Sequence, residues 1–463
     1  MRRFQLLSLL FSLLILFPVK ALGEENSTEQ TGHDNQPVEH VEIHLPQKLL
    51  PGLPAVDASL TMEEALSLGL QNNLNLQVAG AETEIRRALL KEARGKRWPV
   101  LSVGSLTFLR GGNNLTLMTP DIMMNTVDST LFQDLNATGK IPLFTGGQIR
   151  GSIRAARFNL AEAQATLKQA AVEMAYQVRE AYLKALLAQS EHLTHQQHLI
   201  VQQELLRIAE ARYRVGRGLR ADVLRIQTEL ANAQQMLNEE HNRLNQALYD
   251  LKAAMGIDLG SNVSLTETLT ATPWAGSPLP TLVQSAVAEH PRVQEAQQRV
   301  LAAEAQIKIV RATYLPQVYG QVTGNLRFPD RPIQMGNGVI GMVTASLPVF
   351  DRTRDARLQQ THASLKRAQQ ELKVLQLDIG KEIAKAWSEL EFSRQNVALA
   401  ESAIAQAQED LRLIQRRFAV GRAINVEVQD AALTLREARL NQSRAVFNYE
   451  MAKAKLFQAV GKV

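Results

Sequence analysis

Three histidines are the first residues in this chain whose spacing could do chemistry. His192, His195 and His198 recur every third residue along a segment that has a helical pattern. Imidazoles on one helix can bind zinc, but such pairs are usually four residues apart. A spacing of three drifts around the helix surface, so the pattern favours an ordinary helix surface over a metal site.

A glycine pair is the next candidate, for phosphate binding. Residues 145–147 read Thr-Gly-Gly, but the Lys-Ser/Thr of a phosphate-binding loop does not follow them. The motif therefore predicts a strand-to-helix turn. Cysteine is absent, which excludes a Cys nucleophile, a thiolate metal site and a disulfide scaffold. No nucleophile, base and orienting group form a convincing set, so we expect no enzyme activity, no cofactor and no metal.

Carboxylates gather after two Val-Gly steps. Glu427 and Asp430 are three residues apart and would share one face of a helix. Asp222 stands at the position that matches Glu427 in the first half of the chain. Acidic residues at a helix start also complement its dipole, and this simpler role stays open.

The chain that positions these residues repeats itself. Residues 212–217 (Arg-Tyr-Arg-Val-Gly-Arg) recur as residues 417–422 (Arg-Phe-Ala-Val-Gly-Arg), and residues 141–144 (Ile-Pro-Leu-Phe) recur as 347–350 (Leu-Pro-Val-Phe). From the Val-Gly step onward the offset is a constant 205 residues. A repeat of this size is a duplicated architectural unit, and internal repeats recur in membrane transport folds.

The pattern divides the chain into five segments. A basic start, a short apolar run and small residues predict a signal peptide at 1–23; the run is short for a membrane anchor. The polar, proline-containing residues 24–56 predict an extended or disordered leader. Two structural repeats are expected at 57–258 and 281–463, with a linker at 259–280 between them.

Each repeat is expected to begin with a helix. The first runs from about Thr61 to Arg97, with Thr61 as N-cap and Glu64 completing a capping box. The second runs over 281–314, where Pro291 is placed to break or kink it.

Four stretches then predict strands. Apolar or small residues alternate with mostly polar ones over 318–328 and 134–143, while 101–110 and 339–350 alternate less cleanly. The pattern fits membrane barrel strands as well as soluble β-hairpins. Each repeat would supply one hairpin.

Two very long helices follow the hairpins. Residues 147–213 and 352–418 are almost free of helix breakers, and about 67 residues would span about 100 Å. Apolar residues recur every seven positions, which predicts left-handed supercoiling. Each helix should end at a Val-Gly step, and returning helices should cover about 222–255 and 427–460.

Four strands cannot close a membrane barrel alone, so copies of the chain would have to pool them. Two copies would give eight strands and a filled interior, and three would give twelve and a lumen. Strands, a signal peptide and no apolar helix long enough to span a bilayer point to a Gram-negative outer membrane, with the helices in the periplasm.

At this point the sequence resembles the TolC family of outer-membrane efflux proteins. The resemblance rests on four motifs: residues 60–65 (Leu-Thr-Met-Glu-Glu-Ala) with 72–73 (Asn-Asn), 142–147 (Pro-Leu-Phe-Thr-Gly-Gly), 213–216 (Tyr-Arg-Val-Gly) and 222–224 (Asp-Val-Leu). The resemblance implies a mainly α fold with a membrane β-barrel: a homotrimer with a 12-stranded barrel in outer-membrane lipid and a long coiled-coil α-helical tunnel. It also implies a passive exit duct, coupled to an inner-membrane pump through a periplasmic adaptor.

The resemblance also implies roles for the residues at the two turns. Glu427 and Asp430 align with the acidic pair of the periplasmic aperture, where three copies would form a ring of carboxylates, and Asp222 aligns with a closing network. The lock residues of that network are replaced here by Phe418, Ala423 and Ala221, so we expect a different lock or an easier opening. The residues expected to contact an adaptor are Val215, Gly216, Arg217, Leu219, Val420, Gly421, Arg422 and Ile424.

A soluble periplasmic coiled-coil scaffold or adaptor is the alternative from another class. The strand alternation favours the membrane reading. The formal net charge of +5 would fall to +2 without residues 1–23, so charge gives no case for nucleic acid.

Overall fold

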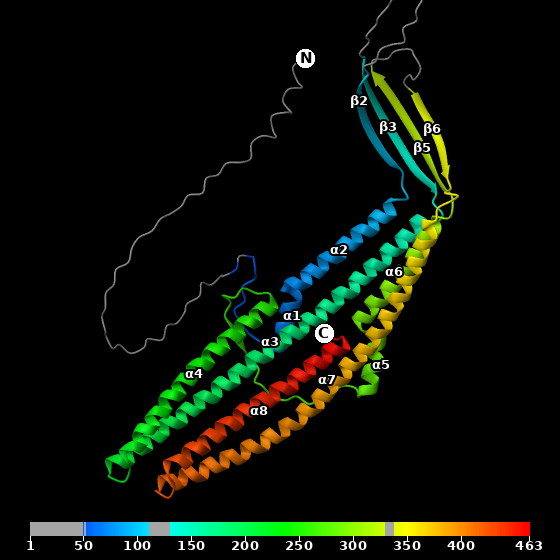
Figure 1. Cartoon of the computed structure of the whole chain (residues 1–463). Coiled ribbons are helices and arrows are strands. Elements are labelled where there is room, and N and C mark those ends of the chain that lie inside the picture. The colour runs from blue at the N-terminus through cyan, green and yellow to red at the C-terminus, as the bar shows by residue number, and fades with distance from the viewer. Residues whose placement is uncertain (1–49, 51, 111–129, 329–337) are drawn as a thin grey trace, which may run out of the picture. The chain divides into compact units, whose positions relative to one another are not determined.

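The computed structural model describes residues 50, 52–110, 130–328 and 338–463. The predicted signal peptide and most of the predicted leader lie outside these residues. Residues Pro46–Val463 form one unit. The fold is mainly α-helical, as expected, and Figure 1 shows long helices lying side by side, with the chain passing from four of them into a small sheet.

The first half of the chain contains two short helices, a strand pair and two long helices. Its elements are β1 (Ala58–Leu60), α1 (Met62–Asn72), α2 (Leu74–Gly95), β2 (Val100–Arg110), β3 (Thr130–Phe144), α3 (Gln148–Arg214) and α4 (Arg220–Met255).

The second half repeats this order. Its elements are β4 (Val263–Leu265), α5 (Leu279–Glu289), α6 (Pro291–Ala312), β5 (Gln317–Phe328), β6 (Gly338–Ser346), α7 (Thr353–Ala419) and α8 (Asn425–Val460). Corresponding helices have the same length: 11 residues in α1 and α5, 22 in α2 and α6, 67 in α3 and α7, and 36 in α4 and α8.

The expectation of one helix over residues 61–97 is wrong, because the chain breaks at Asn73. Asn73 adopts an extended conformation, its side chain accepts a hydrogen bond from the Leu76 amide, and its Nδ2 donates to the Ala254 carbonyl at 2.9 Å. An asparagine that caps the next helix in this way ends the previous one. The predicted capping box of Thr61 and Glu64 is present.

The corresponding break in the second half falls where Pro291 predicted it. Helix α5 ends at Glu289, and Pro291 is the first residue of α6, where the missing amide hydrogen costs nothing. The ring of His290 accepts a hydrogen bond from the Arg292 amide at 3.1 Å and so caps α6.

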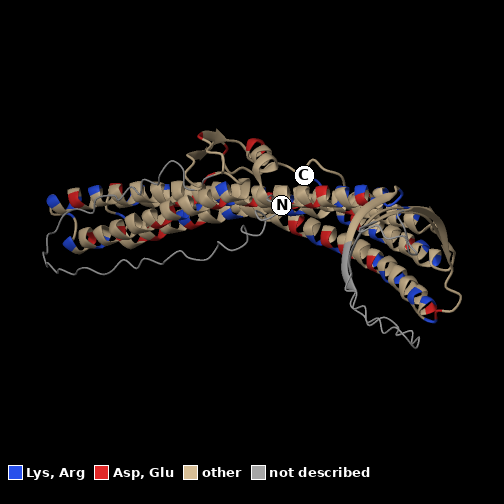
Figure 2. Cartoon of the chain, turned by 90° about the horizontal axis from the view of Figure 1, so that it is seen from above, with Lys and Arg blue, Asp and Glu red and all other residues tan. Residues whose placement is uncertain are grey.

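Apolar residues at the predicted sevenfold spacing are buried in both long helices. In α7, Leu411 and Phe418 are seven residues apart and buried, and in α3, Met174 and Ala181 are also seven apart and buried. Helix α3 packs against α1, α2, α4, α6 and α8, whereas α7 packs against α5, α6 and α8. The two central helices of the long bundle are therefore α3 and α8, and we call their contact the inter-hairpin seam. Figure 2 shows that basic and acidic residues alternate along the helices without segregating.

The four longer strands form one antiparallel sheet in the order β2-β3-β5-β6. The two predicted hairpins are thus joined through β3 and β5, and β2 and β6 are the edges. Strand β6 ends at Ser346, earlier than expected, just before the Leu-Pro step at 347–348.

One face of the sheet is apolar. Register pairs Leu101 with Gly139, Gly139 with Val322, and Val322 with Gly341, so these residues share a face. Leu101 is 76% exposed and Val322 is 54% exposed. The other face carries Thr138 and Thr323, whose hydroxyls lie 3.2 Å apart. The predicted alternation is confirmed along β3 and β5.

Strand β6 departs from that alternation. It places Val339 and Val343 on the apolar face but also Ile340 and Met342 on the polar one, so this edge strand is apolar on both sides. Among the described residues, none of the helices is both long enough and apolar enough to cross a membrane.

Two short strands were not expected. β1 and β4 pair in parallel, with Leu60 opposite Leu265, and tie the start of the first half to the segment after α4. The buried Tyr182 hydroxyl donates to the Leu60 carbonyl at 3.0 Å and holds this pair on α3.

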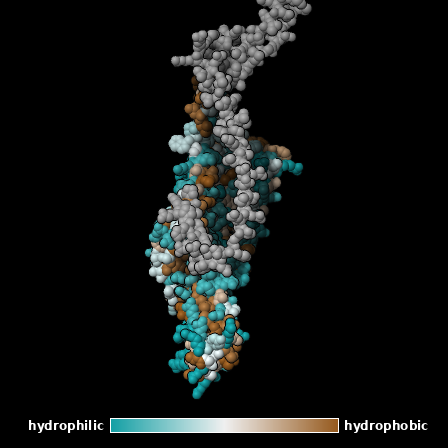
Figure 3. Space-filling model, turned by 90° about the vertical axis from the view of Figure 1, so that its left-hand side faces the viewer, coloured by the Kyte–Doolittle hydropathy of each residue, from teal (hydrophilic) through white to brown (hydrophobic). Residues whose placement is uncertain are grey.

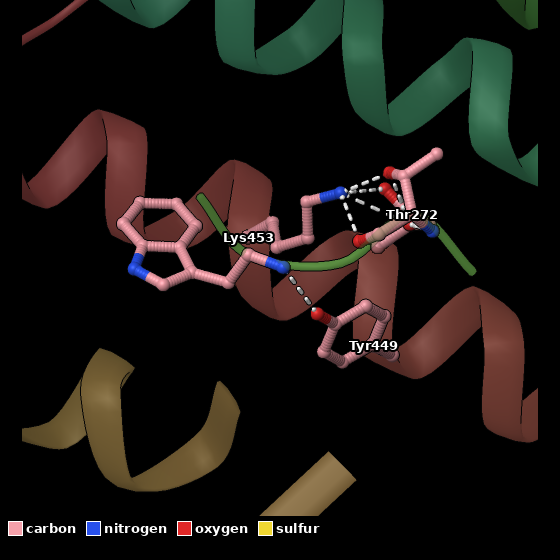
Figure 4. A network of polar contacts seen from close by, with 5 residues as sticks. Thr272, Tyr449 and Lys453 are labelled. Carbon is pink, nitrogen blue, oxygen red and sulfur yellow. Dashed lines mark hydrogen bonds and ion pairs between the residues drawn. The ribbon is translucent and has the colours of Figure 1, made fainter. Parts of the chain in front are cut away.

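The segment predicted as a linker between the repeats is docked on α8. The Glu450 carboxylate accepts from the Thr272 amide at 2.8 Å and pairs with Lys453 at 2.8 Å (Figure 4). The Trp274 amide donates to the Tyr449 hydroxyl at 3.0 Å. These bonds fix the path of the chain between α4 and α5.

Candidate functional site

The first candidate feature is the turn between α3 and α4. Val215 caps α3, and Gly216 follows with φ of 69°, a left-handed conformation. The Gly216 amide donates to the Tyr213 carbonyl at 3.0 Å, and the Arg217 amide donates to the Arg212 carbonyl at 2.9 Å. This pair of bonds is a Schellman motif, which satisfies the last carbonyls of the helix.

The turn between α7 and α8 is built in the same way. Gly421 has φ of 76° after the cap residue Val420. Its amide donates to the Phe418 carbonyl at 2.9 Å, and the Arg422 amide donates to the Arg417 carbonyl at 2.8 Å. Both glycines therefore terminate their helices, as the Val-Gly steps predicted.

Both turns also display apolar side chains to solvent. Exposed aliphatic residues flank each glycine, and the glycines and the arginines that follow them are exposed as well. Clustered apolar residues on a surface are typical of interaction sites, and Figure 3 shows such residues interspersed with polar ones toward the hairpin tips. The exposed aliphatic residues are Val215, Leu219, Val420 and Ile424.

The three predicted aperture carboxylates lie at the starts of the returning helices. Asp222 is in the first turn of α4 and Glu427 in the first turn of α8. Both are partly exposed, and Asp430, one turn further along α8, is exposed. Within the described part of the chain none of the three forms an ion pair, and Asp222 stands on a different hairpin from the other two. Their charges are thus free to act outward.

Two of the replaced lock residues are part of an apolar cluster that joins the hairpins. Phe418 and Ala423 are buried, whereas Ala221 is exposed. The cluster draws side chains from α3, α4, α7 and α8, including Leu205, Ile226 and Leu411. The resemblance implied that the polar contacts of the lock are absent here. In the structure, apolar packing joins the tips at this place instead.

Polar pairs along the inter-hairpin seam were missed by the sequence analysis. Gln202, fully buried, exchanges two amide hydrogen bonds with Gln429 of α8, at 3.0 and 3.1 Å. Further from the tips, Glu191 pairs with Arg444 at 2.9 Å. No local signal marks these residues, because their partners lie more than 200 residues away in the chain.

Two of the three histidines, His195 and His198, lie near Arg436 of α8 on this seam, whereas His192 faces α4. His195 and His198 are buried, and burial, with Arg436 nearby, lowers the pKa of both, that of His198 to about 4. The His192 ring lies 5.8 Å from that of His241 on α4. No group of three or more metal-binding side chains comes together in the described residues.

The tip arginines differ in what they contact. Arg417 donates to the Arg422 carbonyl of its own turn at 3.4 Å. Arg212 instead crosses to the other hairpin, where it meets Phe418. Cations near the end of a helix complement its dipole, which is the role that the sequence predicts for both arginines. The crossing by Arg212 goes beyond that role.

One protein-family model matches both halves of the chain. The model of the outer membrane efflux protein family matches residues 65–257 and 282–462. The two matched segments correspond to the two halves of the fold.

Individual relatives are more distant but cover most of the chain. The outer membrane efflux protein BepC of Brucella suis is 27% identical over 90% of this chain and 88% of its own. The cobalt-zinc-cadmium resistance protein CzcC of Cupriavidus metallidurans is 25% identical, over 85% of this chain and 88% of its own. The alkaline protease secretion protein AprF of Pseudomonas aeruginosa is 21% identical, over 86% and 85%.

Solved structures share the fold at lower identity. The CmeC outer membrane channel of Campylobacter jejuni superposes with a TM-score of 0.74 at 14% identity, covering 93% of this chain and 94% of that one. The outer membrane protein VceC of Vibrio cholerae gives 0.71 at 16% identity, covering 87% and 96%.

Proposed function

As this chain belongs to the outer membrane efflux protein family, we propose that three copies of it form one continuous exit duct. The chain is an outer-membrane channel for efflux or secretion, as its relatives are. A soluble scaffold is therefore not its role. Residues 1–23 would direct its export, and the two repeats 57–258 and 281–463, joined by 259–280, would build the duct.

The exposed face and open edges of the sheet are the observation that supports the proposed assembly. Its apolar face is exposed in the single chain, and its edge strands β2 and β6 have no partner on their outer sides within the described residues. Open edges are not tolerated in lipid. Pairing β6 of one copy with β2 of the next removes every edge, and three copies give twelve strands around a lumen. The apolar face would then meet outer-membrane lipid.

The helices extend the duct into the periplasm. Helices of 67 residues reach about 100 Å. Their turns would be the end that meets a periplasmic adaptor, through Val215, Gly216, Arg217, Leu219, Val420, Gly421, Arg422 and Ile424. An inner-membrane pump would supply the energy, so the channel itself would be passive and carry no catalytic group.

The carboxylates would line the aperture at that end. Glu427 and Asp430 from three copies would form a ring that attracts cations, with Asp222 on the neighbouring hairpin. Their position at the starts of α4 and α8, free of ion pairs among the described residues, supports this role.

Planar-bilayer conductance of the purified, detergent-extracted protein tests this proposal. We expect discrete cation-selective steps, and loss of selectivity in the double variant Glu427→Gln/Asp430→Asn. Glu437→Gln, an exposed carboxylate further up α8, is the matched control and should leave selectivity unchanged. A protein that stays soluble without detergent and never inserts would overturn the duct. Equal selectivity in all three proteins would overturn the aperture.

A further inference from the structure

Besides the apolar cluster that joins the tips of the two hairpins, the Arg212 side chain crosses from one tip to the other, and we propose that Arg212 is a latch that holds the end of the duct closed. We call the contact of Arg212 with Phe418 the tip latch. The inference rests on the proposed function, because only a duct has an end to close.

The contact has two components. The Arg212 guanidinium carbon lies 4.8 Å from the centroid of the Phe418 ring, a cation–π distance. Its Nη1 donates a hydrogen bond to the Phe418 carbonyl at 3.3 Å. That carbonyl also accepts from the Gly421 amide at 2.9 Å, so Arg212 reinforces the Schellman motif of the opposite turn.

The surroundings strengthen both components. Phe418 is only 3% exposed and Arg212 is partly buried, so water competes weakly for the cation. The Phe418 carbonyl is among the last of α7, where the helix dipole favours positive charge. The flat guanidinium can stack and donate at the same time, which a lysine ammonium cannot do in this geometry.

The contact lies nearer to the tips than the glutamine pair of the seam. The Gln202–Gln429 pair closes the seam ten residues earlier in α3, or about 15 Å further from the tips. The tip latch is the contact beyond it, in the last turn of α3. If the two hairpins part at their tips, Arg212 must leave Phe418 while the seam above stays packed.

Within the single chain, the contact is not repeated at the second turn. The residues that correspond to Arg212 and Phe418 are Arg417 and Tyr213. Arg417 bonds within its own turn, and Tyr213 is 47% exposed. Complementing a helix dipole therefore does not require an arginine to cross between hairpins, and the crossing by Arg212 needs its own explanation.

Single-channel recording of the whole assembly tests the latch. Arg212→Gln should raise the ratio of open to closed time on the order of tenfold, by loss of a partly buried cation–π contact and a hydrogen bond. Phe418→Leu should do the same, whereas Phe418→Tyr, which keeps the ring, should retain wild-type gating. Arg214→Gln removes the same charge from an exposed position in the same turn and should change nothing.

A second readout measures the tips directly. The chain has no cysteine, so spin labels at Leu219→Cys and Ile424→Cys report the separation of the two turns. Arg212→Gln should broaden that distance distribution toward longer values, and Arg214→Gln should not.

The outcomes separate the latch from the duct. If the wild type conducts but Arg212→Gln matches it in gating and in tip distance, the latch is wrong and the duct stands. If Arg214→Gln shifts as much as Arg212→Gln, net charge at the tip explains the effect and the latch is again wrong. If no variant conducts after insertion, the proposed duct fails and the latch with it.

Discussion

The two long hairpins have helices of equal length but opposite patterns of burial. In the first hairpin α3 buries a larger share of its residues than α4; in the second, α8 buries a larger share than α7. Val172 of α3 is 2% exposed, whereas Leu377, its counterpart 205 residues later in α7, is 75% exposed. The repeat therefore conserves helix length and turns, but not the environment of each face.

This difference indicates which helix contacts are missing in the single chain. Within one chain the inter-hairpin seam joins α3 to α8. Since α7 corresponds to α3 and α4 to α8, the equivalent seam would join α7 to α4, and in a closed ring these come from different copies. Under the trimer that we propose, exposed residues such as Leu377 and Leu399 of α7 are the halves of contacts that a second copy completes.

The largest expected effect separates the buried Val172 of α3 from its exposed counterpart in α7. Val172→Asp should prevent folding, because an unpaired charge would replace a fully buried side chain at a cost of several kcal/mol. Leu377→Asp should leave the single chain folded but weaken assembly. Circular dichroism and native mass spectrometry in detergent distinguish the two.

The control for this pair is Glu371→Gln, a change at an exposed position on α7. It should alter neither folding nor assembly. If Leu377→Asp assembles as well as this control, the exposed face of α7 is not covered by a second copy, and the correspondence between the seams fails.

The second prediction uses acid to weaken the inter-hairpin seam near His198. His198 has no titratable counterpart in α7, where Ala403 occupies the equivalent position. Burial, then Arg436, lowers the pKa of His198 from 6.5 to about 4 in the packed seam. The packed state therefore binds fewer protons, and its stability falls as pH drops below about 6.5, by on the order of 1–2 kcal/mol at pH 5.

Hydrogen exchange is the measurement for this effect. Amides of α3 and α8 near His198 should exchange faster at pH 5 than at pH 7 after correction for intrinsic rates, while the central part of α7 should not change. His198→Gln should remove part of the difference, with His195 and the His192–His241 pair left to titrate. Equal sensitivity of α7 would mean that acid acts on the whole bundle.

The third prediction tests what the two hairpins share. Gly216→Ala and Gly421→Ala should each cost about 1 kcal/mol, because both residues adopt positive φ in a Schellman motif. Gly80→Ala, in the helical interior of α2 with open space around it, should instead stabilise slightly. Thermal denaturation of the assembly gives the order, and a clear difference between the two turns would show that the tips are not equivalent.

The sequence predicted some of these features and missed others. The constant offset, the Val-Gly steps and the strand alternation predicted the helices, the turns and the apolar sheet face, because each is a local pattern. The break at Asn73 was missed since it depends on the Ala254 carbonyl, which the fold brings near. The crossing of Arg212 and the seam position of His195 and His198 were missed for the same reason: a helix pattern tells which residues share a face, but not which helix that face meets.

The smallest expected effect extends the tip latch from one chain to the ring. By the same correspondence between the seams, the equivalent of Arg212 over Phe418 is Arg417 over Tyr213 of a second copy. Both side chains are exposed in the single chain, as halves of an absent contact would be. Arg417→Gln and Tyr213→Leu should each weaken the assembly by about 0.5–1 kcal/mol, the range of an exposed cation–π contact. Their effects on assembly stability in denaturant should be less than additive if the two side chains touch. Additive effects would mean that Arg417 and Tyr213 do not touch in the assembly. The contact of Arg212 with Phe418 would then have no equivalent between copies.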